Sequence, residues 1–177
     1  MKKIAESELI INNDGSIFHL HLTPDQIADN VILVGDPGRV ATISDMFDSV
    51  EHKVQNREFV THTGYYHGKR FSALATGIGT DNIDIVINEL DALVNIDLKT
   101  RMPKTEHKSL NLVRIGTSGG LQEDMDVDSF LMSETSIGFD GLLNFYKRRD
   151  EVCKADIEAS FIKHMDWNPR IATPYFV

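Results

Sequence analysis

The sequence predicts an α/β fold, because one structural unit recurs along the chain. In this unit a short apolar run is followed by a glycine-rich turn, and the turn is followed by apolar residues at helical spacing. An apolar run between turn residues is typical of a strand buried on both faces, and its alternation with helices is typical of α/β proteins. The glycine-rich turns occupy 35–39, 76–80 and 116–120. Ligands of α/β sheets bind beyond the carboxyl ends of the strands, so these turns are expected to line one crevice.

The first elements are expected after a polar N-terminal arm. Residues 1–16 are mostly polar and predict this arm, so residues 17–177 are expected to form the α/β domain. Thr23 predicts the start of a short helix, since Pro24 suits the first position and Gln26 stands three residues after the cap. The elements expected here are a strand at 9–11, a helix at 24–28, a strand at 31–34 and a helix that includes residues 40–47.

A β-hairpin is the clearest local prediction in the middle of the chain. Residues 59–66 are rich in β-branched and aromatic side chains, residues 67–70 supply a turn, and residues 71–76 form the second strand. The helix that follows is expected to bury one face, made of Ile83, Ile87, Leu90 and Val94. Beyond it the expected elements are an exposed loop at 97–109, strands at 110–115, 127–132 and 171–177, and a helix that includes residues 157–165.

Composition and charge exclude several classes of protein. The 177 residues carry 18 Lys and Arg against 27 Asp and Glu, a formal net charge of −9, whereas nucleic-acid binders need a cationic surplus. The single cysteine, Cys153, excludes an internal disulfide and a cysteine-rich metal site. No run reaches about 18 apolar residues and no signal peptide opens the chain. We therefore expect a cytoplasmic protein without membrane or nucleic-acid partners.

The first glycine-rich turn, Gly35-Asp36-Pro37-Gly38-Arg39, has the residue types of an anion site. Gly35 lets a backbone N–H approach a ligand without a Cβ in the way, and Pro37 stiffens the turn. Arg39 begins the following helix, where free N–H groups favour an anion and the guanidinium adds two donors for phosphate oxygens. The same residues also fit a tight surface turn with a solvated arginine.

The third turn follows a second arginine in an unusual place. Arg114 interrupts the apolar strand at 110–115, and a buried guanidinium is costly unless an anion pairs with it. Its partner is either one of the many carboxylates of the chain or the anion of a ligand. Thr117 and Ser118 offer hydroxyl groups beside the glycines of this turn, which suits the binding of ligand oxygens.

The remaining polar residues carry little signal by themselves. Arg57 is expected at the surface, and His19, which lies between two apolar residues, is expected to be structural. The seven histidines lack the spacing of metal ligands, and Glu58 and Asp81 have no evident partner for acid–base catalysis. We expect neither a cofactor nor a metal from these patterns.

Five segments of the chain are informative when they are taken together. They are Phe18-His19-Leu20, Gly35-Asp36-Pro37-Gly38-Arg39, Arg57-Glu58-Phe59, Thr76-Gly77-Ile78-Gly79 and Arg114-Ile115-Gly116-Thr117-Ser118-Gly119. In their order and spacing they resemble the nucleoside phosphorylase superfamily, and most closely its uridine phosphorylases. The resemblance spans residues 17–145. It implies a three-layer αβα fold with a central mixed, partly barrel-like sheet, and it implies that this chain is an N-terminal portion that is incomplete at its C-terminus.

The resemblance also implies which residues bind which ligand. Members of the family form dimers with shared active sites, often assembled into hexamers, and the residues matching Arg57 and His19 come from the neighbouring subunit. Some members hold a potassium ion at the positions of Glu58, Ile78 and Asn82, although Asn82 stands where a serine is usual. The implied phosphate-binding residues are Gly35, Arg39, Arg57, Arg114 and Thr117, and the implied nucleoside-binding residues are His19, Thr117, Ser118 and Gly119.

The implied activity is that of a pentosyltransferase: phosphorolysis of a nucleoside, uridine in particular, to ribose 1-phosphate and the free base, with inorganic phosphate as co-substrate. A phosphate dianion held by guanidinium groups stabilises the charge that develops on the ribosyl group, so no metal or covalent nucleophile is needed. Two alternatives stay open, a nucleosidase that uses water and a catalytically incomplete phosphate-binding module. The family's base-binding segment has no match in residues 1–177, so this chain alone is expected to bind phosphate without efficient turnover.

Overall fold

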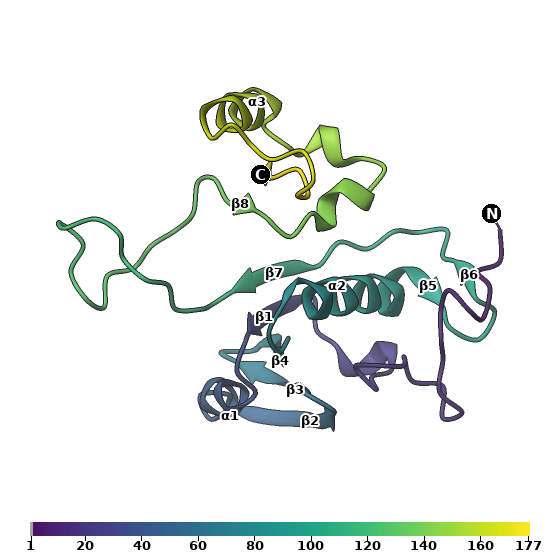
Figure 1. Cartoon of the computed structure of the whole chain (residues 1–177). Coiled ribbons are helices and arrows are strands. Elements are labelled where there is room, and N and C mark those ends of the chain that lie inside the picture. The colour runs from purple at the N-terminus through teal and green to yellow at the C-terminus, as the bar shows by residue number, and fades with distance from the viewer. Residues whose placement is uncertain (1) are drawn as a thin grey trace. The chain divides into compact units, whose positions relative to one another are not determined.

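The computed structural model describes residues 2–177 and divides the chain into two compact units, Met1–Ser118 and Gly119–Val177. In Figure 1 the first unit is the sheet with its helices, and the second contains α3 and two short strands. Each unit is described by itself below. The predicted boundaries, an arm at 1–16 and one domain over 17–177, stay a prediction.

A five-stranded mixed sheet forms the centre of the first unit, with the strand order β2-β3-β4-β1-β7 (Figure 1). β1 is parallel to β4 on one side and to β7 on the other, whereas β2, β3 and β4 are antiparallel neighbours. The predicted α/β class is confirmed, and the sheet is open rather than closed into a barrel. The strands are β1 Asn30–Val34, β2 Ser49–Asn56, β3 Phe59–Tyr66, β4 Lys69–Ala75 and β7 Asn111–Arg114.

Helices cover both faces of this sheet. Successive side chains of a strand point to opposite faces, and the two ends of β1 illustrate this. Leu33 packs in one core cluster with Leu90 of α2 (Thr80–Asn95), whereas Val34 packs in another with Val40 of α1 (Gly38–Ser44). The first unit therefore has the helix–sheet–helix layers that the sequence predicts.

The predicted hairpin is confirmed as β3 and β4, and the strand before it, β2, was not predicted. The two hairpin strands pair from Thr61 with Leu74 to Tyr66 with Lys69. β2 is an edge strand whose residues are exposed or half-buried, and it includes Glu51 and Lys53. Charged side chains are common on edge strands because they oppose edge-to-edge association, and here they remove the apolar alternation that identifies a strand.

Helix α2 buries a face that overlaps the predicted one only in part. Leu90 is buried as predicted and Val94 packs partly buried against the same core, but Ile87 is 36% exposed. The rest of the buried face is made of Val86, Leu93 and the carboxylate of Glu89. A prediction made from the spacing of apolar residues places every carboxylate on the solvent side of the helix. Because Glu89 is buried, the predicted buried face was shifted away from the observed one.

The region predicted as an exposed loop at 97–109 contains a small two-stranded sheet. β5 (Ile96–Asp97) pairs antiparallel with β6 (Met102–Pro103), and Leu98 between them is buried. The many charges around it hide this short pairing from a sequence pattern. The prediction of a loop without core residues is therefore wrong in part.

Two elements predicted near the N-terminus are shorter than expected. The strand at 9–11 is reduced to a single bridge between Ile11 and Ile17. The helix at 24–28 is one 3-10 turn, Pro24–Gln26, in which the side-chain oxygen of Gln26 accepts the backbone N–H of Thr23 at 2.9 Å. The predicted cap therefore forms, but the turn does not extend, because Ile27 already has extended backbone angles.

The strand predicted at 110–115 exists as β7, but it is exposed rather than buried. All four of its residues are exposed, and Val113 is 59% exposed. Within residues 2–177 this strand is the last of the sheet and pairs only with β1. An apolar strand at an uncovered edge has the same sequence pattern as a central strand, so the pattern alone did not distinguish the two.

A partly buried aromatic cluster packs together the elements of the second unit. The ring of Phe161 lies 5.4 Å from that of Phe176 and 5.9 Å from that of Trp167, and Phe139 stacks on Trp167 at 5.7 Å. Phe161 belongs to α3 (Ala155–His164), which confirms the predicted helix near 157–165. The other elements of this unit are β8 Ile137–Gly138, η2 Leu142–Phe145, η3 Arg149–Glu151 and β9 Tyr175–Phe176.

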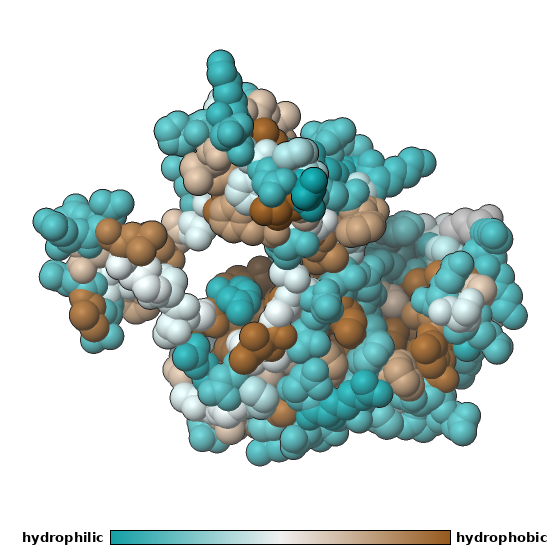
Figure 2. Space-filling view, in the orientation of Figure 1, coloured by the Kyte–Doolittle hydropathy of each residue, from teal (hydrophilic) through white to brown (hydrophobic). Residues whose placement is uncertain are grey.

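The strand predicted at 127–132 is not formed. Residues 119–135 contain no helix or strand, and Phe130 and Met132 are exposed, so apolar patches lie at the surface of this segment (Figure 2). A strand needs a neighbour for its backbone N–H and C=O groups, and no strand of residues 2–177 pairs with this segment. The strand predicted at 171–177 is likewise reduced to Tyr175–Phe176, which pairs with β8.

None of the helices in residues 2–177 combines the length and the apolar content that crossing a bilayer requires.

Two alanine substitutions in α2 test which of its faces is buried. Leu90 is 1% exposed, so Leu90→Ala is expected to lower the free energy of unfolding by about 2–5 kcal/mol through lost burial and a residual cavity. Ile87 is 36% exposed, so Ile87→Ala is expected to lower it by about 1 kcal/mol or less. Urea unfolding followed by circular dichroism measures both values. Equal losses would contradict the buried face described above.

Candidate functional site

An open cavity of about 580 Å³ lies in the first unit, at the carboxyl ends of β1, β4 and β7. Because these three strands are parallel, their ends meet at one edge of the sheet, and the glycine-rich turns after them share one crevice. The lining residues are Gly35, Asp36, Pro37, Arg39, Glu58, Gly77, Ile78, Asn82, Arg114, Gly116 and Thr117.

The guanidinium of Arg114 lies close to the backbone of two glycines. A Cβ on Gly35 would lie at ordinary contact distance, 3.6 Å from Nη2 of Arg114, and a Cβ on Gly116 would lie 3.0 Å from Nη1. A side chain at 116 would therefore require the guanidinium to shift by a few tenths of an ångström, whereas a Cβ at 35 fits. Gly116 thus lets the backbone approach this charged group closely.

Arg39 and Arg114 bring two positive charges to this cavity. Neither forms an ion pair with a carboxylate within residues 2–177. The structural ion pair that the sequence left open for Arg114 is therefore not formed in the described chain, and Arg114 is exposed rather than buried. Two unpaired guanidinium groups in one crevice favour an anionic ligand there.

The two carboxylates in the lining are engaged by other groups. Asp36 Oδ1 accepts the backbone N–H of Gly38 at 2.9 Å, which fixes the turn before α1. Glu58 Oε1 accepts a hydrogen bond from the amide Nδ2 of Asn82 at 3.2 Å. Asp36 is therefore engaged within its own turn and Glu58 by α2, and neither carboxylate occupies the two arginines.

Potassium, which the resemblance implies at Glu58, Ile78 and Asn82, does not fit these residues as they stand. Asn82 Nδ2 donates to Glu58 Oε1 and to the carbonyl oxygen of Ile78, both at 3.2 Å. A cation between the same two oxygens would face the amide hydrogens of Asn82. Among residues 2–177 no three His, Cys, Asp or Glu side chains are grouped so that they could hold a metal ion.

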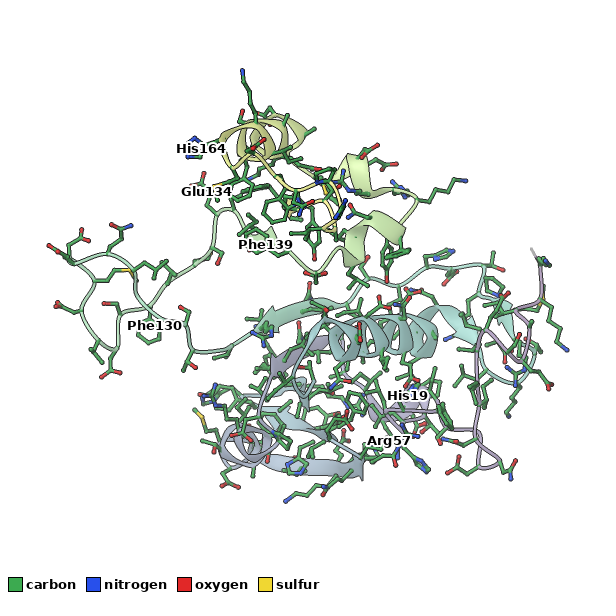
Figure 3. The ribbon with its side chains drawn as sticks, in the orientation of Figure 1. His19, Arg57, Phe130, Glu134, Phe139 and His164 are labelled. Atoms are coloured by element: carbon green, nitrogen blue, oxygen red, sulfur yellow. The ribbon has the colours of Figure 1, made fainter. Side chains whose placement is uncertain are left out.

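His19 and Arg57 both lie against Phe18, outside the cavity lining. The guanidinium carbon of Arg57 is 5.5 Å from the ring centroid of Phe18, and the His19 ring is 4.7 Å from the same ring. Figure 3 shows both side chains near each other on the first unit. Arg57 occupies the tight turn between β2 and β3 with a φ of 54°.

Glu89 of α2 holds His19, and sequence reasoning did not select it. Its carboxylate accepts the backbone N–H groups of His19 and Leu20, at 3.0 and 2.8 Å, and lies 2.7 Å from the imidazole Nδ1 of His19. With Nδ1 occupied, the imidazole Nε2 is the nitrogen left for another partner. One feature of the sequence could have identified Glu89: this acidic residue lies between Val86 and Leu90, on the apolar face of the helix that packs against the core.

The structure therefore places the predicted site residues in two groups. Four of them line the cavity, and His19 and Arg57 share a second surface around Phe18. Ser118 is exposed and is not part of the lining, and Gly119 belongs to the second unit. The four in the cavity are Gly35, Arg39, Arg114 and Thr117.

A crevice with two unpaired arginines at the strand ends of an open sheet defines an α/β protein with a candidate anion site, and comparison with known sequences gives its family. Residues 29–173 match the phosphorylase superfamily, and the chain belongs to this family. It is 28% identical over 160 residues to a uridine phosphorylase of Thermococcus kodakarensis, covering 90% of this chain and 53% of that protein. It is 34% identical over 121 residues to a DeoD-type purine nucleoside phosphorylase of Clostridium perfringens, covering 67% of this chain and 45% of that protein.

A solved structure agrees with this family. The crystal structure of a Trypanosoma brucei nucleoside phosphorylase, which shows uridine phosphorylase activity, matches with a TM-score of 0.80 and 31% identity. The match covers 95% of this chain and 57% of that protein. The chain thus spans about half the length of the curated relatives it matches. Members of this family use phosphate as a co-substrate without a cofactor.

Substitution of Glu89 tests how strongly it holds the His19 segment. Glu89→Ala leaves two backbone N–H groups without their acceptor, so we expect the free energy of unfolding to fall by about 2–4 kcal/mol. Asp81→Ala, which removes an exposed carboxylate from the same helix, is expected to cost at most about 1 kcal/mol. Chemical denaturation of both variants gives the comparison. A Glu89 variant as stable as the Asp81 variant would refute this role.

Proposed function

We propose that the chain provides the phosphate-binding part of a nucleoside phosphorylase that acts on uridine and forms ribose 1-phosphate and uracil. The observation that carries this proposal is the pair Arg39 and Arg114, which line one cavity without a carboxylate partner in the described chain. The choice of uridine is supported by two relatives, a uridine phosphorylase and a nucleoside phosphorylase with uridine phosphorylase activity.

In this reaction the main role of the cavity is to bind and position phosphate. Two guanidinium groups bind the dianion through charge-assisted hydrogen bonds, with the Gly35 backbone and the Thr117 hydroxyl as further donors. As the C1′–N bond of the nucleoside lengthens, the ribosyl group gains positive charge, which the adjacent dianion stabilises. A phosphate oxygen then bonds to C1′, and the bonding electron pair leaves with the base, which takes up a proton. Positioning supplies most of the rate, since no covalent enzyme intermediate is formed.

Arg57 and His19 enter this proposal through a second copy of the chain. Their side chains lie against Phe18 on a surface that is not part of the cavity lining. In a twofold dimer, such a surface on one subunit can complete the cavity of the other. Arg57 would then add a third guanidinium to the phosphate, and Nε2 of His19 would reach the ribose. The protein is accordingly proposed to be a homodimer or a hexamer built from three dimers, acting in the cytoplasm in pyrimidine salvage.

A second candidate function applies to the 177-residue chain by itself. The chain spans about half the length of its relatives, which favours a module that binds phosphate without turnover when no further residues supply the base pocket. Separate calorimetric titrations with phosphate and with uridine distinguish the two candidates. Heat from phosphate alone supports the binding module for this chain, whereas heat from both ligands supports a complete site.

Arg114→Ala tests the phosphate site directly. Loss of one guanidinium is expected to weaken phosphate binding about 10- to 100-fold, as measured by isothermal titration calorimetry. The melting temperature should hardly change, because Arg114 is exposed and has no carboxylate partner in the described chain. Arg148→Ala, which removes an exposed arginine of the second unit, is the matched control and should bind phosphate normally. Unchanged affinity in the Arg114 variant would exclude this site, and a nucleosidase would lose no activity when phosphate is omitted.

Mixing two inactive variants tests the shared site in the complete gene product. Arg57→Ala and Arg114→Ala each damage every site of their own homodimer. In a mixed dimer with shared sites, one site receives both substitutions and the other receives none. After subunit exchange at equal amounts, we expect about one quarter of the native uracil release to return. No recovery, despite proven exchange, would place Arg57 and Arg114 in the same subunit's site.

A further inference from the structure

Asn82 links two turns at the wall of the cavity. Its amide Nδ2 donates to Glu58 Oε1 in the turn between β2 and β3 and to the carbonyl oxygen of Ile78 in the turn between β4 and α2. All three residues line the cavity. We call this three-residue arrangement the Asn82 clip.

The chemistry of the two acceptors explains why an amide suits this place. A carboxylate oxygen and a backbone carbonyl oxygen carry no hydrogen, so only a donor or a cation can satisfy both at once. The NH₂ group of asparagine has two hydrogens and can serve both oxygens. A serine hydroxyl has one hydrogen and would leave one oxygen for another partner.

The packing around the clip leaves no spare room on its inner side. A Cβ on Gly77 would lie 2.7 Å from Asn82 Nδ2 and 3.0 Å from Glu58 Cγ. Gly77 also has a φ of 69°, in the region that favours glycine. The amide therefore rests against bare backbone, in the position that an ion bound to the same two oxygens would take.

We propose that the Asn82 amide replaces a monovalent cation in this protein, so that the two turns are cross-linked without potassium. The proposal goes beyond the phosphorylase function, because it concerns how the cavity wall is held rather than what binds in it. The stability of the two turns, and of the cavity wall beside Arg39 and Arg114, should therefore not depend on which monovalent cation is in solution.

Melting curves without phosphate test the clip, so a failure of the phosphate site cannot be confused with a failure of the clip. The 177-residue chain is expected to melt at the same temperature in potassium chloride and in tetramethylammonium chloride at equal ionic strength. Asn82→Ser is expected to melt about 2–4 °C lower in tetramethylammonium chloride. The control, Asn88→Ser, changes an amide that bonds Asp84 within the same helix and should melt within about 1 °C of the native chain.

Two melting results would overturn the proposal. One is a rise in the native melting temperature as potassium replaces tetramethylammonium, because an ion that binds the folded state stabilises it more as the ion concentration increases. The other is an Asn82→Ser variant that melts like the Asn88→Ser control. Thallium(I), used as a spectroscopic probe for a potassium site, gives a second readout that needs no destabilised variant. Saturable thallium binding to the native chain that Glu58→Gln abolishes would also refute the clip, whereas no binding supports it.

Discussion

The parallel pairing of β1 with β4 and β7 is the constraint on which the candidate site depends. It brings the carboxyl ends of three strands to one edge, and each strand is followed by a glycine-rich turn. Arg39 and Arg114, 75 positions apart in sequence, consequently line the same crevice. The register of a few backbone hydrogen bonds thus decides which charges meet, and no contact between the two side chains is needed.

In a chain of net charge −9, the two arginines of the crevice stay unpaired because the carboxylates beside them accept hydrogen bonds from other groups. Asp36 accepts the N–H of Gly38 in its own turn, and Glu58 accepts from Asn82. Neither carboxylate pairs with Arg39 or Arg114. The overall charge of the protein therefore says little about the potential inside a small site, which the nearest few groups determine.

How much the sequence could predict depended on whether a feature is local. The hairpin of β3 and β4, strand β1 and the glycine-rich turns follow from neighbouring residues, since glycine, proline and β-branched residues act within a few positions. That the turns share one crevice follows instead from the rule that ligands of open α/β sheets bind beyond the carboxyl ends of the strands. Burial depends on distant segments, and there the predictions failed: Arg114 and Val113 lie on an exposed edge strand, and Glu89 lies in the core. A carboxylate becomes acceptable in a core when donors from elsewhere in the fold reach it, and those donors have no signature near Glu89 itself.

At Arg57 the backbone conformation that favours stability and the side chain that serves the candidate site call for different residues. Glycine and asparagine adopt its φ of 54° readily. For other residues this left-handed conformation lowers the free energy of unfolding by about 1 kcal/mol. The hairpin turn would fold more favourably with glycine, yet it carries the long cationic side chain that lies over Phe18. An engineer who selects this protein only for heat resistance would be drawn to position 57, and would remove a guanidinium from the surface beside His19.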